Sequence, residues 1–401
     1  MRSGYFCPFR AEITNGGKAP IPDHGRVTTA IQNAARRAWL RLARVPGLDF
    51  ATARALLDRL GGPEALLAAE KAELAVAGLA GAGLHALASP DESTLERDLC
   101  WLDAPGRSLL TPAEPGYPPA LAATKGAPLV LFVQGDPSVL ALPQLAIVGS
   151  RAATAAGRET AFEFAGRLSA AGLVITSGLA TGIDAAAHRG ALAAGGMTIA
   201  VCGTGLDQVY PAEHVALAAS ITAQGALVSE FSTDTAPMAA NFPRRNRLLS
   251  GLGRGVLVVE AAARSGSLIT ARLAGEQGRD VMAVPGSIHN ALARGCHRLI
   301  KDGAALVESP EDVLATIGFH GCVAPATASG TGRNSGRKLD SAEEMLLNAL
   351  GFEPAHLDKL VERTGFPAHA VASMMQLLEL DGRIESLAGG RYSRIPPRQA
   401  R

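Results

Sequence analysis

Cysteine, aromatic residues and net charge are all scarce in this chain of 401 residues. The five cysteines never form a C-x-x-C pair; they are Cys7, Cys100, Cys202, Cys296 and Cys322. This spacing predicts neither a disulfide framework nor a zinc site, and it is typical of a protein in the reducing cytoplasm. Aromatic residues make up only 4%, so the cores must be mainly aliphatic. With 38 Lys+Arg against 37 Asp+Glu, any site for a polyanion must be a local patch.

Long apolar runs are also missing. No run reaches the ~18 residues that a membrane-spanning helix needs. The first 25 residues include Arg2, Arg10, Glu12 and Asp23, which does not fit the apolar centre of a signal peptide. We therefore expect no membrane association. Hydrophobic residues nevertheless make up 47% of the chain, which is enough to build large cores.

Several motifs of nucleotide and hydrolytic enzymes are absent. The chain has no G-x-x-x-x-G-K-[ST] phosphate loop, no G-x-S-x-G and no H-E-x-x-H. After the first strong apolar strand, Gly149 is followed by Ser150 and Arg151 rather than by G-x-G-x-x-G. Asp184 and His188 are four residues apart on one helical face, a pair that is more often structural than catalytic. We therefore predict no catalytic residues, no cofactor and no metal.

From residue 145 onward, short apolar strands alternate with helical segments. The predicted strands are 145–150, 173–178, 197–203, 226–230, 255–260, 281–286 and 305–309. Alternation of this kind predicts an α/β fold with a mostly parallel sheet covered by helices on both faces. The strands are almost continuously apolar, as expected when both faces are buried.

The remaining segments divide the chain further. We predict a flexible tail, a helical domain resembling a SAM or helix-hairpin-helix unit, the α/β domain, a basic linker and a winged-helix domain; their ranges are 1–28, 29–110, 111–318, 319–339 and 340–396. The last assignment depends on three helices followed by the two-strand pattern GRIESLAGGRYSR.

Glycine follows most of the predicted strands, in GSR (149–151), SGLATGID (177–184), GTG (203–205) and PGS (285–287). Glycine lets backbone N–H groups approach an anion, and helix N-termini add a positive dipole. RSGSLITA (264–271) offers two hydroxyls as well, and NFPRRNRLLSGLGRG (241–255) carries four arginines and no acid. Because ligands of open parallel sheets bind beyond the carboxyl ends of the strands, we predict an anion-binding groove there.

Seven of these motifs also match a known family in order and spacing. They are AIVGSRAATAAG, SGLATGIDAAAH, GTGLDQVYP, FPRRNRLLSGL, EAAARSGSLITA, VPGS and GCHRLIKDGA. Together they closely resemble the DNA-processing protein A (DprA/Smf) family over about residues 110–315. The resemblance implies an extended Rossmann-like domain that binds no dinucleotide.

The resemblance also implies a function. Members of this family bind single-stranded DNA, form homodimers and load the recombinase RecA during natural transformation, and a contact with single-strand-binding protein is compatible with that role. Carried over by motif, the predicted DNA-binding residues are Ser150, Arg151, Gly178, Gly182, Arg245, Asn246, Arg247, Arg264, Ser265, Gly266 and Ser267.

Three positions depart from the family pattern. Thr181 stands where some members have a basic residue, which predicts a weaker contact there, and His297 stands where many have Asn. Asp49 follows Pro-Gly-Leu, where a DNA-binding helix-hairpin-helix prefers Gly, so this hairpin is predicted to serve packing.

The alternative function is hydrolysis of nucleoside monophosphates, as in a related Rossmann-like family with the motif P-G-G-x-G-T-x-x-E. The segment VPGSIHNALARGC lacks the second Gly and the G-T-x-x-E. Glu230 and Glu260, at strand ends, are the carboxylates such a reaction would require. We expect them instead to orient the arginines by ion pairing.

Overall fold

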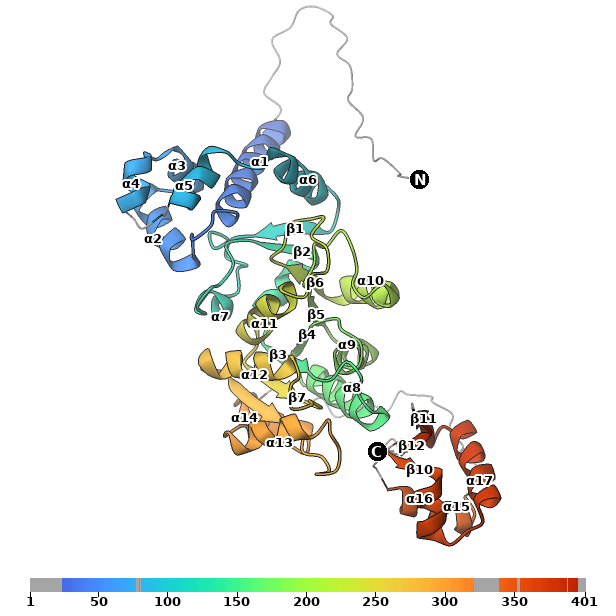
Figure 1. The fold of residues 1–401 in the computed structure, drawn as a ribbon. Helices are drawn as coiled ribbons and strands as arrows, with labels where there is room; N and C mark the ends of the chain where they lie inside the picture. Colours follow the sequence, from blue (N-terminus) through green and yellow to red (C-terminus); the bar gives the residue numbers. More distant parts are fainter. Residues whose placement is uncertain are drawn as a thin grey trace, which may run out of the picture.

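A nine-stranded sheet forms the centre of the computed structural model (Figure 1). The structure describes residues 24–76, 79, 81–320, 339–351, 354–387 and 389–395, with side chains from residue 33. Residues 1–23 of the predicted tail and 321–338 of the predicted linker lie outside the described residues. Residues 24–28, also predicted as tail, already belong to the first helix. The mostly parallel α/β architecture predicted from the sequence is confirmed.

The strand order in the sheet is β1-β2-β6-β5-β4-β3-β7-β8-β9. The strands are β1 (Arg107–Leu110), β2 (Leu131–Gly135), β3 (Gln144–Val148), β4 (Val174–Ser177), β5 (Thr198–Val201), β6 (Ala226–Ser229), β7 (Gly255–Val258), β8 (Asp280–Ala283) and β9 (Ala305–Leu306). The seven strands from β3 to β9 are parallel and match the predicted ones. β1 and β2 extend the sheet with antiparallel pairs and were not predicted. Because β1 pairs with β2, the sheet begins before residue 111, where the sequence places the start of the α/β domain.

Helices cover both faces of this sheet. They are η1 (Pro137–Ala141), α7 (Pro119–Ala122), α8 (Ala155–Ala170), α9 (Ile183–Ala193), η2 (Ala212–His214), α10 (Val215–Gln224), α11 (Asn241–Leu252), α12 (Ser267–Glu276), α13 (Arg294–Lys301) and α14 (Pro310–Thr316). Figure 1 shows α8 and α9 on one side of the sheet and α11 and α12 on the other. One apolar core contains the inner faces of α8, α9 and α14, and a second contains those of α11 and α12.

In the part of the chain that the structure describes, six helices precede the sheet: α1 (His24–Ala43), α2 (Phe50–Leu60), α3 (Pro63–Ala68), α4 (Lys71–Val76), α5 (Gly81–Ala88) and α6 (Glu92–Leu102). Asp49 caps α2, because its carboxylate accepts the Thr52 N–H at 2.7 Å. Gly61 ends α2 with a positive φ of 91°, which favours glycine. Apolar side chains of these N-terminal helices join the core that contains α11 and α12, so the helices pack on the sheet.

The C-terminal residues form a separate small domain with its own apolar core. Its elements are α15 (Ser341–Leu350), β10 (Ala355–His356), α16 (Leu357–Thr364), α17 (Ala368–Leu380), β11 (Ile384–Leu387) and β12 (Arg391–Arg394). The strands pair in the order β10-β12-β11. The predicted winged helix is therefore confirmed, with β10 as an additional short strand.

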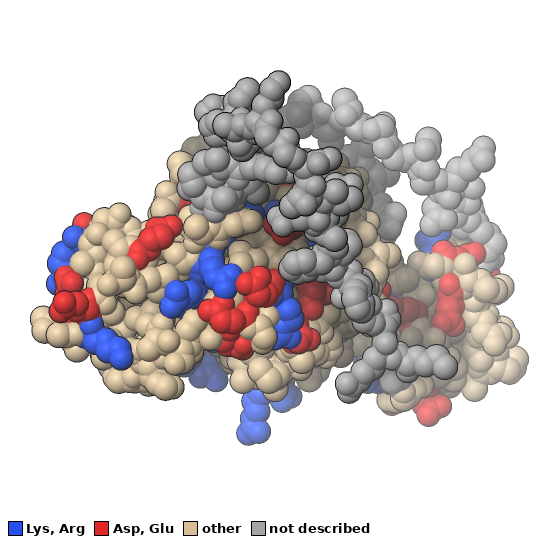
Figure 2. Space-filling model, turned by 90° about the horizontal axis from the view of Figure 1, so that it is seen from above, with Lys and Arg blue, Asp and Glu red and all other residues tan. Residues whose placement is uncertain are grey.

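Charge is distributed without a continuous basic surface on the face shown in Figure 2, where lysines and arginines lie in small groups among acids. This agrees with the formal net charge of +1. Within the described part of the chain, no helix is both long and apolar enough to cross a membrane.

Candidate nucleic-acid interface

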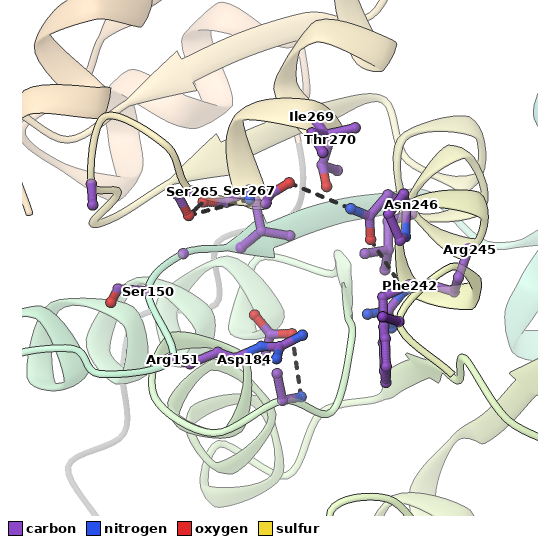
Figure 3. A pocket seen from close by; sticks show the side chains of 18 of the residues that line it. Ser150, Arg151, Asp184, Phe242, Arg245, Asn246, Ser265, Ser267, Ile269 and Thr270 are labelled. Carbon is purple, nitrogen blue, oxygen red and sulfur yellow. Dashed lines mark hydrogen bonds between the residues drawn. The ribbon is translucent and has the colours of Figure 1, made fainter. Parts of the chain in front are cut away.

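A cavity of about 730 Å³ lies at the carboxyl ends of β3 and β7. The loop after β3, the start of α11 and the start of α12 line it. Figure 3 shows Ser265 and Ser267 above the cavity, Arg151 and Asp184 below it, and Phe242 and Asn246 to the right. The position is the one that strand topology dictates, since parallel strands bring their carboxyl ends to one edge.

Arg151 is the exposed cation of this cavity. Its guanidinium lies 5.3 Å from the centre of the Phe242 ring, and within the described ranges no acidic side chain pairs with it. Ser150 is buried in the same loop, and its carbonyl accepts the Ile183 N–H at 3.1 Å. This bond ties the loop to the start of α9, so Arg151 projects from a fixed backbone.

Arg245 is a buried cation in the wall of the cavity, with 4% of its surface exposed. Its Nη1 donates to the Gly178 carbonyl at 2.9 Å and to the Val201 carbonyl. Burial lowers its pKa, while the Asp184 carboxylate favours its charged form. Arg245 thus joins the ends of β4 and β5 and places positive charge behind the cavity surface.

Asp184 is the buried acid beside it. Its Oδ2 accepts the N–H groups of Gly178 and Ala180 at 3.1 and 3.3 Å. Burial raises the pKa of Asp184, and Arg245 opposes that change. The pair balances charge inside the wall, so the cavity surface itself keeps Arg151 as its exposed charge.

The N-terminus of α12 forms the opposite wall. The hydroxyls of Ser265 and Ser267 are 2.6 Å apart, and Asn246 Nδ2 donates to the Gly266 carbonyl at 3.4 Å. A side chain at Gly266 would meet no atom within 4 Å, so the backbone here is open to a ligand. Arg264 is exposed next to this helix end but does not line the cavity. The N–H groups of Ser265, Ser267 and Leu268 already donate within this turn. The exposed backbone at Gly266, the two hydroxyls and the helix dipole together favour an anion at this wall.

Gly178 and Gly182 act within the protein rather than on the cavity surface. A Cβ on Gly178 would lie 2.6 Å from the Arg245 guanidinium. Gly182 has a φ of 77°, and a Cβ there would lie 2.2 Å from the Ser150 carbonyl oxygen. Gly178 thus leaves room for the Arg245 side chain, and Gly182 lets the loops after β3 and β4 approach each other. Thr181 joins the same contact, because its hydroxyl donates to the Arg151 carbonyl at 3.2 Å.

The arginine cluster of residues 241–255 separates into different surfaces. Arg244 and Arg247 pair with Glu230 and line a second cavity of about 160 Å³, together with Asp49 of the N-terminal helices. Arg254 lies 5.6 Å from the centre of the Phe319 ring. The reason is helical periodicity: at ~100° per residue, Arg245 and Arg247 point to nearly opposite sides of α11. This separation of the arginines can be inferred from the sequence once the segment is assigned to a helix.

The predicted roles of the two strand-end acids have different outcomes. The expected ion pairing is confirmed for Glu230, which accepts from Arg244 Nη2 at 3.1 Å and from Arg247. It is wrong for Glu260, which accepts the Thr154 N–H at 2.9 Å and the Thr154 hydroxyl at 2.7 Å. Glu260 therefore stabilises the start of α8.

Asp184 and His188 have separate partners. The Thr198 hydroxyl donates to the Ile175 carbonyl, so its 2.7 Å contact with His188 must use a proton on His188 Nδ1. His188 Nε2 is buried without a partner among the described residues. Burial, with His214 and Arg245 nearby, lowers the His188 pKa to about 3, so the ring is neutral at pH 7. The structural interpretation of this pair agrees with these contacts. Among the described residues, no three acidic, histidine or cysteine side chains form a group suited to a metal.

Comparison with known proteins shows the family to which this chain belongs. The family "DNA recombination-mediator protein A" matches residues 108–318, and the "DprA winged helix domain" matches residues 332–390. Protein Smf of Escherichia coli (strain K12) is 47% identical over 309 residues, which cover 75% of this chain and 81% of that protein. The chain belongs to the DprA/Smf family. The DNA processing protein DprA of Streptococcus pneumoniae (strain ATCC BAA-255 / R6) is 48% identical over 203 residues, covering 51% of this chain and 72% of that protein.

A solved DprA structure has the same fold. The X-ray structure of DNA processing protein A from Streptococcus pneumoniae superposes with a TM-score of 0.62 at 36% identity, covering 71% of this chain and 99% of that chain. The family match includes every residue that lines the main cavity. The cavity is therefore part of the DprA domain itself.

Proposed function

We propose that this DprA-family chain binds single-stranded DNA in the main cavity and loads RecA onto it during natural transformation. Family membership gives the coarser role, DNA processing. The finer proposals rest on the family resemblance. They are RecA loading, homodimer formation, a contact with single-strand-binding protein and a cytoplasmic location.

One observation carries the DNA-binding proposal. Two groups face the same cavity: Arg151, which has no acidic partner in the described part of the chain, and the start of α12, with its two serine hydroxyls and the exposed backbone of Gly266. Both are donors suited to phosphate oxygens, and Arg245 adds buried positive charge behind them. Such donors bind the phosphate backbone without reading the base sequence.

The aromatic edge of the cavity favours unpaired nucleic acid. Tyr210 and Phe242 have ring centres 5.7 Å apart, and Tyr210 is 46% exposed. Exposed aromatic faces beside a cationic groove stack on bases, which are accessible in a single strand. In a duplex, the bases already stack on each other, so this surface discriminates against double-stranded DNA.

We propose binding rather than catalysis as the function. Hydrolysis of a nucleoside monophosphate needs a carboxylate positioned at the reacting bond. Glu230 pairs with two arginines at the second cavity, and Glu260 accepts hydrogen bonds from Thr154. Both carboxylates considered for the hydrolase are engaged in these contacts. The geometry therefore supports DNA binding better than hydrolysis.

The test compares the affinity of the purified chain for labelled single- and double-stranded DNA in gel shifts, and then measures RecA filament formation with and without the chain. We expect a clear preference for the single strand and faster filament formation. Equal affinity for both DNA forms would overturn the proposed site. In parallel, the chain alone is incubated with ATP or nucleoside monophosphates; release of phosphate or base above a Glu230→Gln, Glu260→Gln control would favour the hydrolase.

A further inference from the structure

A carboxylate of the winged-helix domain binds the N-terminus of α8. Glu385, on β11, accepts the Ala155 N–H at 2.9 Å and the Arg158 Nη2 proton at 2.8 Å. Figure 1 shows β11 and β12 beside the end of α8. Ala155 and Glu385 are 230 residues apart in sequence. This is therefore a contact between domains, not a local helix cap.

A local cap that does not involve Glu385 also stabilises the start of α8. The Thr154 hydroxyl accepts the Gly157 N–H at 3.0 Å, and Glu260 accepts the Thr154 N–H. The first turn of α8 thus holds two carboxylates from distant parts of the chain, as expected from its free N–H groups and positive dipole end. Arg158 is oriented toward this position by a 2.7 Å bond from Nη1 to the Ala153 carbonyl.

Glu385 accepts hydrogen bonds from an amide N–H and a guanidinium, and these are the donors that also bind phosphate oxygens. The Glu385 oxygens therefore mark where the oxygens of an anionic ligand would lie. Arg151 of the main cavity precedes Ala155 by four residues, so their Cα atoms are at most about 14 Å apart at ~3.5 Å per residue. One strand of nucleic acid can reach both positions.

We propose that the N-terminus of α8 and Arg158 form a second phosphate-binding site on the single-strand path, which Glu385 occupies until DNA displaces it. This proposal rests on the proposed function. It assigns the winged-helix domain a competitive role: when docked, it covers one phosphate position of the neighbouring domain.

The contact has the exposure expected of a reversible one. The side chain of Arg158 is 44% exposed and that of Glu385 is 22% exposed. Ion pairs with this exposure are weak and are screened by salt. The winged helix also has its own apolar core, so its release from α8 leaves that core intact. A polyanion held at Arg151 can therefore replace Glu385 without unfolding either domain.

The experiment uses the full chain and a fluorescently labelled oligothymidylate. Glu385→Gln removes the competing charge and keeps the size of the side chain. Its matched control is Glu362→Gln, which removes the same charge from an exposed site on α16. Arg158→Gln is paired with Arg189→Gln, an exposed arginine on α9. The double variant Arg158→Gln, Glu385→Gln completes the cycle.

We expect Glu385→Gln to bind about two- to five-fold tighter, the range that a partly exposed ion pair can oppose. Glu362→Gln should bind like the unchanged chain. In the double variant, Arg158→Gln should cancel this gain in affinity. It should also flatten the log–log salt dependence of binding by about 0.7 relative to Glu385→Gln alone. A gain that persists in the double variant, or no gain in Glu385→Gln while Arg151-dependent binding is intact, would overturn this inference alone. Absence of any Arg151-dependent binding would overturn it together with the proposed function.

Discussion

At the scale of single residues, burial decides what each arginine does. Arg151 is exposed, so its charge is available to a ligand. Arg245 is 4% exposed and its donors are used by the Gly178 and Val201 carbonyls, so it stabilises the wall. Arg247 pairs with Glu230 at another surface. Substitution of these three arginines should therefore have different consequences.

Arg151→Ala should weaken single-strand binding equally for all base sequences, because phosphate contacts carry no base information. The log–log salt slope should fall by about 0.7, and the free energy of unfolding should stay within about 0.5 kcal/mol. Arg189→Ala is the control for lost charge on an exposed site. Titration at several salt concentrations checks this, and unchanged affinity in Arg151→Ala would remove the residue from the site.

Arg245→Ala should instead destabilise the chain by about 3–5 kcal/mol, because it leaves the buried Asp184 carboxylate without its cation and two carbonyls without a donor. Denaturant unfolding measures this loss. Arg247→Ala leaves the main cavity unaltered, so its DNA affinity should stay near that of the unchanged chain. Normal stability of Arg245→Ala would contradict the structural role.

The buried His188 predicts a dependence of stability on pH. Its folded pKa is lowered to about 3, whereas the unfolded value is ~6.5. Between these values the unfolded chain binds more protons, so stability is lost as the pH falls from 7. The His188 contribution should fall by about 2 kcal/mol between pH 7 and pH 5.

The raised pKa of Asp184 acts in the opposite direction, so the comparison needs a variant that keeps Asp184. His188→Asn retains a polar group near the Thr198 hydroxyl and cannot titrate. Unfolding curves at pH 7 and pH 5 should show a smaller loss for His188→Asn than for the unchanged chain. Equal losses would mean that His188 is not the group responsible.

At the scale of elements, glycines at strand ends serve two purposes. Gly182 has a positive φ and lets two loops touch, whereas Gly266 has a helical backbone and open space where a side chain would lie. The first is required by the fold, and the second leaves room for a ligand at the N-terminus of α12.

Gly266→Ala should leave stability within about 0.5 kcal/mol and weaken single-strand binding, because the added methyl group occupies the open approach to the Gly266 backbone and the adjacent serine hydroxyls. Gly182→Ala should cost at least about 1–3 kcal/mol of stability from backbone strain. Paired unfolding and binding measurements separate the two effects. Full DNA affinity in Gly266→Ala would place the phosphates away from α12.

At the scale of the whole molecule, the apolar cores set the independent units. The N-terminal helices share a core with the sheet, while the winged helix has a core of its own. The main cavity is lined wholly by the first of these units. Binding and winged-helix folding are therefore separable.

A chain shortened to residues 1–320 should unfold cooperatively and still bind single-stranded DNA, since it keeps the complete sheet and cavity. Removal of Glu385 should make binding equal to or tighter than that of the full chain. Circular dichroism and gel shifts check both points. Loss of binding in a folded shortened chain would make the winged helix the primary site.

The sequence by itself determined the seven parallel strands, the winged helix and the family, because near-continuous apolar runs, helical periodicity and ordered glycine motifs are local properties. It missed β1 and β2, which are four and five residues long and precede the alternation of strands and helices that begins at residue 145. Of the predicted DNA-binding residues, the structure brings Ser150, Arg151, Arg245, Asn246, Ser265, Gly266 and Ser267 to one cavity and separates Arg247 from them. Only tertiary structure decided this division, the burial of Arg245 near Asp184 and the Glu385 contact, because each depends on which helix faces meet and how deeply each charge is buried.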